Sequence, residues 1–257
     1  MRWIELENAV NVRDVGGLPA GDGASTRHGR LVRSDNLQDL SGQDVTRLVE
    51  EVGVSTVIDL RSVAEVESEG PAPMKALTSI EHLHMSLLPE AGAMTDVAKD
   101  ALAVNRERAV ARDPENVAGA FYIGYLEDRP DSVVNALRAI ADAPGAALVH
   151  CAAGKDRTGV VVALALSAVG VPREEVVADY VATGERIEQI LDRLRSSPTY
   201  ANDVDNIPAH EHDPRPEIME RFLAHLDDEH GGPVGWLTAH GFTRQDLAHL
   251  KAKLLDA

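Results

Sequence analysis

The chain has 257 residues, a formal net charge of −17, 44% hydrophobic and 4% aromatic residues, and a single cysteine. This length fits one large domain or two small ones, and the charge argues against non-specific nucleic-acid binding and against wide contact with anionic membranes. One cysteine excludes an intramolecular disulfide and a multi-cysteine metal site.

The first residues lack the apolar run of a signal peptide, so we expect a cytoplasmic protein without stable membrane insertion. Ser41–Glu51 is predicted to form a helix, because Ser41 can cap it and Gly53 follows its last turn. Val54–Leu60 is short, β-branched and apolar, which is typical of a buried strand. Ile80–Leu87 alternates in hydrophobicity and is predicted to be another strand.

The segment Pro89–Pro114 is charged, alanine-rich and weakly patterned. We expect residues 89–130 to contain an insertion, folded as helices, that forms a lid over one face of the domain. Helices are predicted at Asn116–Leu126 and Ser132–Ala141, with a break between them at Pro130.

Ala146–Val149 is a compact apolar strand, and Thr158–Ala168 is an apolar helix that Gly170 ends. From Pro172 onward the pattern is almost wholly helical, so residues 172–257 are expected to form a helical flank. Alternating strands and helices favour an α/β fold with a central, largely parallel sheet flanked by helices. We predict a single domain over residues 1–257.

Between this strand and this helix lies the sequence His150-Cys151-Ala152-Ala153-Gly154-Lys155-Asp156-Arg157-Thr158-Gly159. Cys151 is the candidate nucleophile, but an unperturbed thiol has a pKa of about 8.5 and is mostly protonated at neutral pH. A helix N-terminus, an adjacent guanidinium and inward-pointing backbone N–H groups stabilise a thiolate. The same N–H groups, from Ala152 through Gly159, would bind phosphate oxygens.

Each remaining residue type in the loop suits phosphoryl transfer. Arg157 offers a planar fork for two phosphate oxygens, and the Thr158 hydroxyl can donate to the Cys151 sulfur. Gly154 permits a tight turn, and Gly159 allows close packing. His150 is better placed to bond the loop backbone than to act as a base.

A cysteine followed after five residues by Arg157-Thr158 resembles the active loop of the protein tyrosine phosphatase superfamily. The loop is most similar to an atypical bacterial branch with dual or triple specificity, as are Asn11–Gly17, Arg30–Ser34 and Val57–Ser62. The resemblance implies a tyrosine-phosphatase-like fold, no metal and no organic cofactor. It implies phosphotyrosine as the first substrate, with phosphoserine, phosphothreonine and phosphoinositides as others. Lys155 would suit substrates with more than one phosphate.

The general acid stays open, because neither tryptophan precedes a Pro-Asp pair. Asp156 matches the residue that the atypical branch uses, although it could instead be a structural carboxylate paired with the loop cations. Glu90 resembles an acidic position that relatives place over the pocket, where it would contact substrate. Asp128 and Asp131 flank a proline and could form a mobile acid loop.

Four charged residues are predicted to form carboxylate–guanidinium pairs behind the site: Arg13, Asp14, Asp59 and Arg61. The run His210–Asp213 looks like a metal cluster, but no further ligand is assignable and we predict a polar loop.

Three other functions compete with an active protein phosphatase. The loop could serve an inositol-polyphosphate phosphatase, or an inactive phosphate-binding module that regulates partners. Arsenate reduction would need an external thiol, because Cys151 has no second cysteine to resolve an intermediate. We expect a monomer that acts on a phosphorylated protein or a phosphoinositide.

Overall fold

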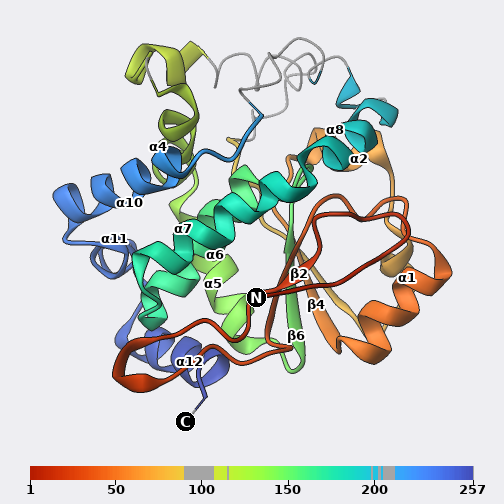
Figure 1. Cartoon of the computed structure of the whole chain (residues 1–257), viewed down its shortest axis with the longest axis horizontal. Helices are drawn as coiled ribbons and strands as arrows, with labels where there is room; N and C mark the ends of the chain where they lie inside the picture. The colour runs from red at the N-terminus through yellow and green to blue at the C-terminus, as the bar shows by residue number, and fades with distance from the viewer. Residues whose placement is uncertain (90–106, 115, 198, 202–203, 205–211, 257) are drawn as a thin grey trace.

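Six strands form a mixed sheet in the order β1-β2-β3-β6-β4-β5, with helices against both faces (Figure 1). The computed structural model describes residues 1–89, 107–114, 116–197, 199–201, 204 and 212–256. The strands are β1 (Arg2–Trp3), β2 (Arg13–Asp14), β3 (Leu31–Ser34), β4 (Val54–Asp59), β5 (Glu81–His84) and β6 (Ala146–His150).

Neighbours among β3, β6, β4 and β5 pair in parallel, whereas β1 and β2 extend the β3 edge in antiparallel orientation. The predicted α/β fold with a largely parallel sheet is therefore confirmed. Ser34 of β3 and Asp59 of β4 both lie beside His150 in the register. Because the carboxyl ends of these strands meet at one edge, Cys151 leaves the sheet at its centre, where α/β folds place their ligands.

The helices are α1 (Gly42–Thr46), α2 (Val63–Glu69), α4 (Val117–Asp128), α5 (Pro130–Asp142), α6 (Asp156–Val169), α7 (Arg173–Ala182), α8 (Ile187–Ser196), α10 (Pro216–His230), α11 (Pro233–Ala239) and α12 (Arg244–Leu254). Short turns of other helical types occur at η1 (Gly21–Gly23), η2 (Arg47–Glu51), η3 (Pro73–Ala76) and η4 (Thr183–Arg186). No helix within the described ranges is both long enough and apolar enough to cross a membrane.

The strand side chains alternate between two apolar cores. Ala147 and Val149 of β6 face the larger core, to which α4, α5, α6 and the C-terminal helices contribute. Leu148 of the same strand faces a smaller core on the α1 side, together with Val57 and Leu48. Both faces of β6 are thus buried, which explains its unbroken apolar sequence.

Most predicted elements are confirmed, with shifts at their ends. The helix predicted at Thr158–Ala168 begins at Asp156, because the Gly159 N–H donates to the Lys155 carbonyl (2.9 Å) and closes a first turn two residues earlier. The strand predicted at Ile80–Leu87 is shorter, since β5 ends at His84. The predicted break at Pro130 is confirmed, because this residue opens α5 directly after α4.

In its described residues, the region from Pro172 to Leu254 consists of helices joined by short turns and bends, as expected for the flank. The strands β1, β2 and β3 were not predicted. The first two have only two residues each and carry no periodic signal, and the four residues of β3 are too few for a clear one. The lid predicted within 89–130 falls partly on residues 90–106, outside the described residues. Residues 107–112 are helical and continue towards α4.

Candidate functional site

The loop between β6 and α6 is held from outside by its backbone carbonyls. The Ala152 carbonyl accepts from the Asn36 N–H (2.9 Å), and the Ala153 carbonyl accepts from Asn11 Nδ2 (2.8 Å). The Gly154 carbonyl accepts from Arg33 Nη2 (2.6 Å). In a trans peptide the N–H points away from the carbonyl of the same unit. The N–H groups that follow these three carbonyls therefore turn to the opposite side, as a phosphate cradle requires.

Gly154 makes this path possible. Its φ of +67° lies in the left-handed region, and a Cβ there would stand 2.4 Å from the Ser34 carbonyl oxygen of β3. Gly159 is also tightly packed, because a Cβ on it would lie 3.2 Å from the Tyr180 ring. The predicted reasons for both glycines agree with these contacts, although the close neighbour of Gly159 comes from α7.

Behind the loop, one buried carboxylate joins two buried arginines. Asp179 of α7 accepts from Arg13 Nε (2.9 Å) and from Arg33 Nη1 (2.5 Å). Burial and the charge of the neighbouring Arg33 lower the pKa of Arg13, Asp179 opposes them, and the net result is a pKa of about 10. Burial would raise the Asp179 pKa, but the two arginines lower it below its usual value. Asp179 thereby fixes the arginine that holds the Gly154 carbonyl.

Of the predicted scaffold pairs, the one between Asp59 and Arg61 is present, and the other two residues have partners that were not predicted. Arg61 donates from Nη2 to Asp59 (2.6 Å) and from Nε to the same carboxylate (2.9 Å). Arg13 pairs with Asp179, as described above, whereas Asp14 pairs with His28 (3.0 Å) near the N-terminal strands. Asp179 itself escaped sequence reasoning, since an acidic residue in the middle of a helix carries no local signal for burial.

Cys151 is a free, buried cysteine with 2% of its surface exposed. The ring of His150 contacts the Cys151 carbonyl through Nδ1 (3.3 Å) and lies 3.6 Å from Asp59 through Nε2. Burial, together with the charges of Arg61 and Arg157, lowers the pKa of His150. Asp59 opposes this effect, and the net pKa is about 4. His150 is therefore neutral at neutral pH, and the contact with the loop backbone agrees with the predicted role.

Arg157, in the first turn of α6, forms a bidentate pair with Glu65 of α2. Its two terminal nitrogens donate over 2.6 Å and 2.8 Å, and Tyr200 donates to the same carboxylate (3.1 Å). Burial would raise the pKa of Glu65, but the Arg157 charge lowers it to about 2. Burial would lower the pKa of Arg157, but Glu65 raises it well above its usual value. The pair fixes the guanidinium plane beside the loop.

Glu65 was missed by sequence reasoning. The run Ser62-Val63-Ala64-Glu65 carries one signal, because it fits a capping box, and the structure has that box at the start of α2. The capping pattern predicts the helix start but says nothing of the arginine that reaches Glu65 from 92 residues away.

Thr158 is fully buried, and its hydroxyl has no hydrogen-bond partner in the described part of the chain. A buried polar group without a partner is unusual and costs free energy. The described contacts do not include the predicted donation from this hydroxyl to the Cys151 sulfur, so that role stays a prediction.

Asp156 and Lys155 form an ion pair, and each also has a second partner. The Asp156 carboxylate accepts from Tyr122 (2.7 Å) through Oδ1, and Lys155 Nζ lies 3.7 Å from the same atom. Lys155 also donates to the His212 carbonyl (2.8 Å). Arg157 pairs with Glu65, so Lys155 is the loop cation that pairs with Asp156 in the described part of the chain.

The other candidate acids are placed differently. Glu90 lies outside the described residues. Asp128 ends α4 and pairs with Arg108 (3.7 Å), while Asp131, in the first turn of α5, pairs with Arg129 (3.1 Å). The two helices meet almost directly, so the structure has a helix junction where a mobile loop was considered. The run His210–Asp213 is described only at its last two residues, and the described residues contain no cluster of metal-binding side chains.

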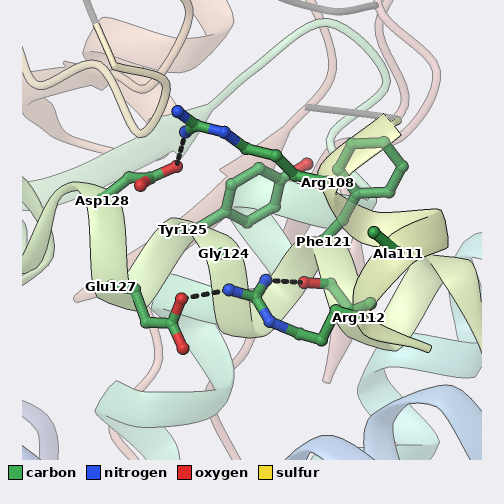
Figure 2. Close-up of a pocket in the computed structure, with 9 residues that line it drawn as sticks. Arg108, Ala111, Arg112, Phe121, Gly124, Tyr125, Glu127 and Asp128 are labelled. Carbon is green, nitrogen blue, oxygen red and sulfur yellow. Dashed lines mark hydrogen bonds and ion pairs between the residues drawn. The ribbon is translucent and has the colours of Figure 1, made fainter. Parts of the chain in front are cut away.

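A cavity of about 440 Å³ lies between residues 107–112 and α4 (Figure 2). Arg108 extends past the Tyr125 ring to Asp128, and Arg112 binds the Ala120 carbonyl (3.0 Å) and the Glu127 carboxylate. Burial raises the pKa of Tyr125, and the charge of Asp156 raises it further. Tyr125 therefore lines this cavity while lying near enough to Asp156 to feel its charge.

Comparisons with known proteins match the chain to tyrosine phosphatases. A model described as "Tyrosine phosphatase family" matches residues 4–256. The chain is 32% identical over 188 residues, or 72% of its length, to a provisionally named tyrosine-protein phosphatase of Cupriavidus necator, and it spans 64% of that protein, less than two thirds. It is 28% identical over 281 residues to the triple specificity protein phosphatase PtpB of Mycobacterium tuberculosis, covering 98% of each chain. A tyrosine-protein phosphatase of Nostoc commune is 26% identical over 241 residues, which cover 88% of this chain and 74% of the relative.

Proposed function

This chain belongs to the tyrosine phosphatase family, and on that premise we propose that it hydrolyses phosphate monoesters through a covalent intermediate on Cys151. In the first step the Cys151 thiolate attacks phosphorus, so an S–P bond forms as the bond from phosphorus to the ester oxygen breaks. Asp156 gives its proton to the leaving oxygen. In the second step water attacks phosphorus and returns a proton to Asp156, the S–P bond breaks, and inorganic phosphate leaves.

The observation that best supports this proposal is how the loop between β6 and α6 is held. Three successive carbonyls are anchored from outside, which turns the N–H groups of residues 153–155 towards the opposite side. Arg157 is held rigid by Glu65, so its fork needs little reorganisation to meet phosphate. Such preorganised donors stabilise the charge of a transferring phosphoryl group.

The substrate range is the finer part of this proposal. We place phosphotyrosine first, with phosphoserine, phosphothreonine and phosphoinositides as further substrates. The relative named a triple specificity phosphatase supports the wider range. Lys155 would add a second cation for substrates with more phosphates, and in that case its amine must leave the His212 carbonyl.

Four other expectations are proposals. A single catalytic domain over residues 1–257 is supported by the one family match across residues 4–256. Glu90 as a substrate contact and a monomeric state stay predictions. A reducing compartment such as the cytoplasm suits a nucleophile that must remain a free thiol.

The alternative of an inactive phosphate-binding module is less favoured, because Cys151, Arg157 and Thr158 are all present and Arg157 is held by Glu65 beside the loop. The test is hydrolysis of 4-nitrophenyl phosphate with EDTA present, by the wild type and by Cys151→Ser. We expect activity in the wild type and none in the variant, which should still bind inorganic phosphate. Phosphate binding by a folded wild type that releases no product would favour the module instead. Activity retained by Cys151→Ser would contradict the covalent mechanism.

A further inference from the structure

Two buried tyrosines lead to the Asp156 carboxylate. Tyr122 of α4 donates to Asp156 Oδ1 (2.7 Å), and its oxygen lies 2.8 Å from the Tyr180 hydroxyl of α7. A tyrosine hydroxyl has one proton, so a Tyr122 that donates to the carboxylate must accept from Tyr180. The hydrogen bonds therefore run in one direction, from Tyr180 to Tyr122 to Asp156.

The two hydroxyls are permanent donors. Burial raises the pKa of Tyr122 well above its usual value, and burial also raises the pKa of Tyr180. Their rings pack edge to face with centroids 6.1 Å apart, and Phe222 packs edge to face on Tyr122 at 5.9 Å. Packing from α4, α7 and α10 thus fixes the position of the Tyr122 oxygen relative to α6.

The contacts distinguish the two carboxylate oxygens. In the part of the chain that the structure describes, both Tyr122 and Lys155 Nζ (3.7 Å) approach Oδ1. The Asp156 side chain is 35% exposed, in contrast to its buried neighbours. With Oδ1 occupied as an acceptor, Oδ2 is the atom that can carry a transferable proton.

We propose that Tyr122, supported by Tyr180, is a positioning residue for the general acid, which directs the proton of Asp156 to Oδ2. This inference rests on the proposed function. As the ester bond breaks, the Oδ2 proton moves to the leaving oxygen and the carboxyl group becomes an anion. The Tyr122 hydrogen bond strengthens as that charge develops, and Tyr180 polarises the Tyr122 hydroxyl. The tyrosines themselves exchange no proton.

The test compares kcat/KM for phenyl phosphate with kcat/KM for 4-nitrophenyl phosphate. Phenol resembles tyrosine, with a pKa of about 10, so phenolate needs a proton on departure more than the less basic 4-nitrophenolate does. We expect Tyr122→Phe to lower the ratio of phenyl to nitrophenyl activity about 10-fold, and Tyr180→Phe to lower it by a smaller factor of about 3-fold. Each phenylalanine keeps the buried ring, and thermal melting checks that each variant folds.

Two controls separate this role from a structural one. In the background of Asp156→Asn, adding Tyr122→Phe should change the ratio no further, because its effect passes through Asp156. Tyr125→Phe removes a hydroxyl one turn along α4 and should leave the ratio at the wild-type value, whatever it does to the rate common to both substrates. Equal loss on both substrates in Tyr122→Phe, or a further fall in the Asp156→Asn background, would overturn the inference while leaving the phosphatase intact. A wild type inactive on 4-nitrophenyl phosphate would instead overturn the proposed function, and this inference with it.

Discussion

Replacing Glu65 with glutamine removes the charge that holds Arg157 while keeping the shape of the side chain. The carboxylate is 4% exposed and accepts both Arg157 bonds, so the variant leaves a buried cation facing an amide. The lowering of the Glu65 pKa from 4.5 to about 2 corresponds to about 3 kcal/mol of folding free energy at neutral pH. Removing one partner of a buried ion pair typically costs about 3–5 kcal/mol, which agrees with this value.

Urea unfolding of the wild type and of Glu65→Gln should therefore differ by about 3 kcal/mol at pH 7. A carboxyl whose pKa is lowered by folding stabilises the fold above its unfolded pKa, and this contribution disappears as the pH falls towards the folded pKa. The difference between the two proteins should thus shrink by about 1 kcal/mol between pH 7 and pH 4, and should disappear towards pH 2. We also expect kcat/KM for 4-nitrophenyl phosphate to fall about 10-fold or more, because the fork of Arg157 is no longer oriented.

Glu67→Gln is the matched control, because it makes the same change two positions along α2 at an exposed residue. Its stability should stay within about 0.5 kcal/mol of the wild type at both pH values. The reasoning is refuted if Glu65→Gln is as stable as Glu67→Gln, or if its loss of stability does not change with pH.

Three further predictions follow from the described contacts. Asp179→Asn should lower the free energy of unfolding by about 3 kcal/mol and weaken phosphate binding, because two buried arginines lose their shared anion. Exposed Asp192→Asn should change neither quantity, and equal effects of the two variants would contradict the scaffold role. Gly154→Ala should reduce activity strongly and cost about 1–3 kcal/mol, because a Cβ would meet a β3 carbonyl at 2.4 Å, whereas Gly21→Ala, with open space around it, should leave activity unchanged in the same assay. His150, whose pKa is about 4 in the folded state, should show no NMR titration between pH 5.5 and 8. It should also reduce stability as the pH falls below about 6.5, because the histidine of the unfolded chain gains a proton there. An NMR titration midpoint near 6.5 in the folded protein would contradict its burial.

The sequence alone was sufficient for features that depend on neighbouring residues. The strand Ala146–His150, the loop after it and the helix that follows are contiguous, and each is encoded by local chemistry: a short apolar run, a glycine that accepts a positive φ, and an apolar helix ended by Gly170. The nucleophile, the arginine and the family resemblance follow from the same ten residues. The helix start was misplaced by two residues, because no side-chain cap marks it.

Other features were decided only by the tertiary structure. The groups that position the loop come from far along the chain: Glu65 lies 92 residues from Arg157, Asp179 lies 146 residues from Arg33, and Tyr122 lies 34 residues from Asp156. A charged or hydroxyl side chain reads as an ordinary surface residue in a sequence, since its burial depends on which helices pack against it. The same holds for β1 and β2, whose two-residue strands exist because β3 offers unpaired backbone groups. Sequence therefore predicts which groups react, and packing determines how they are oriented, because orientation requires contacts that local propensity does not encode.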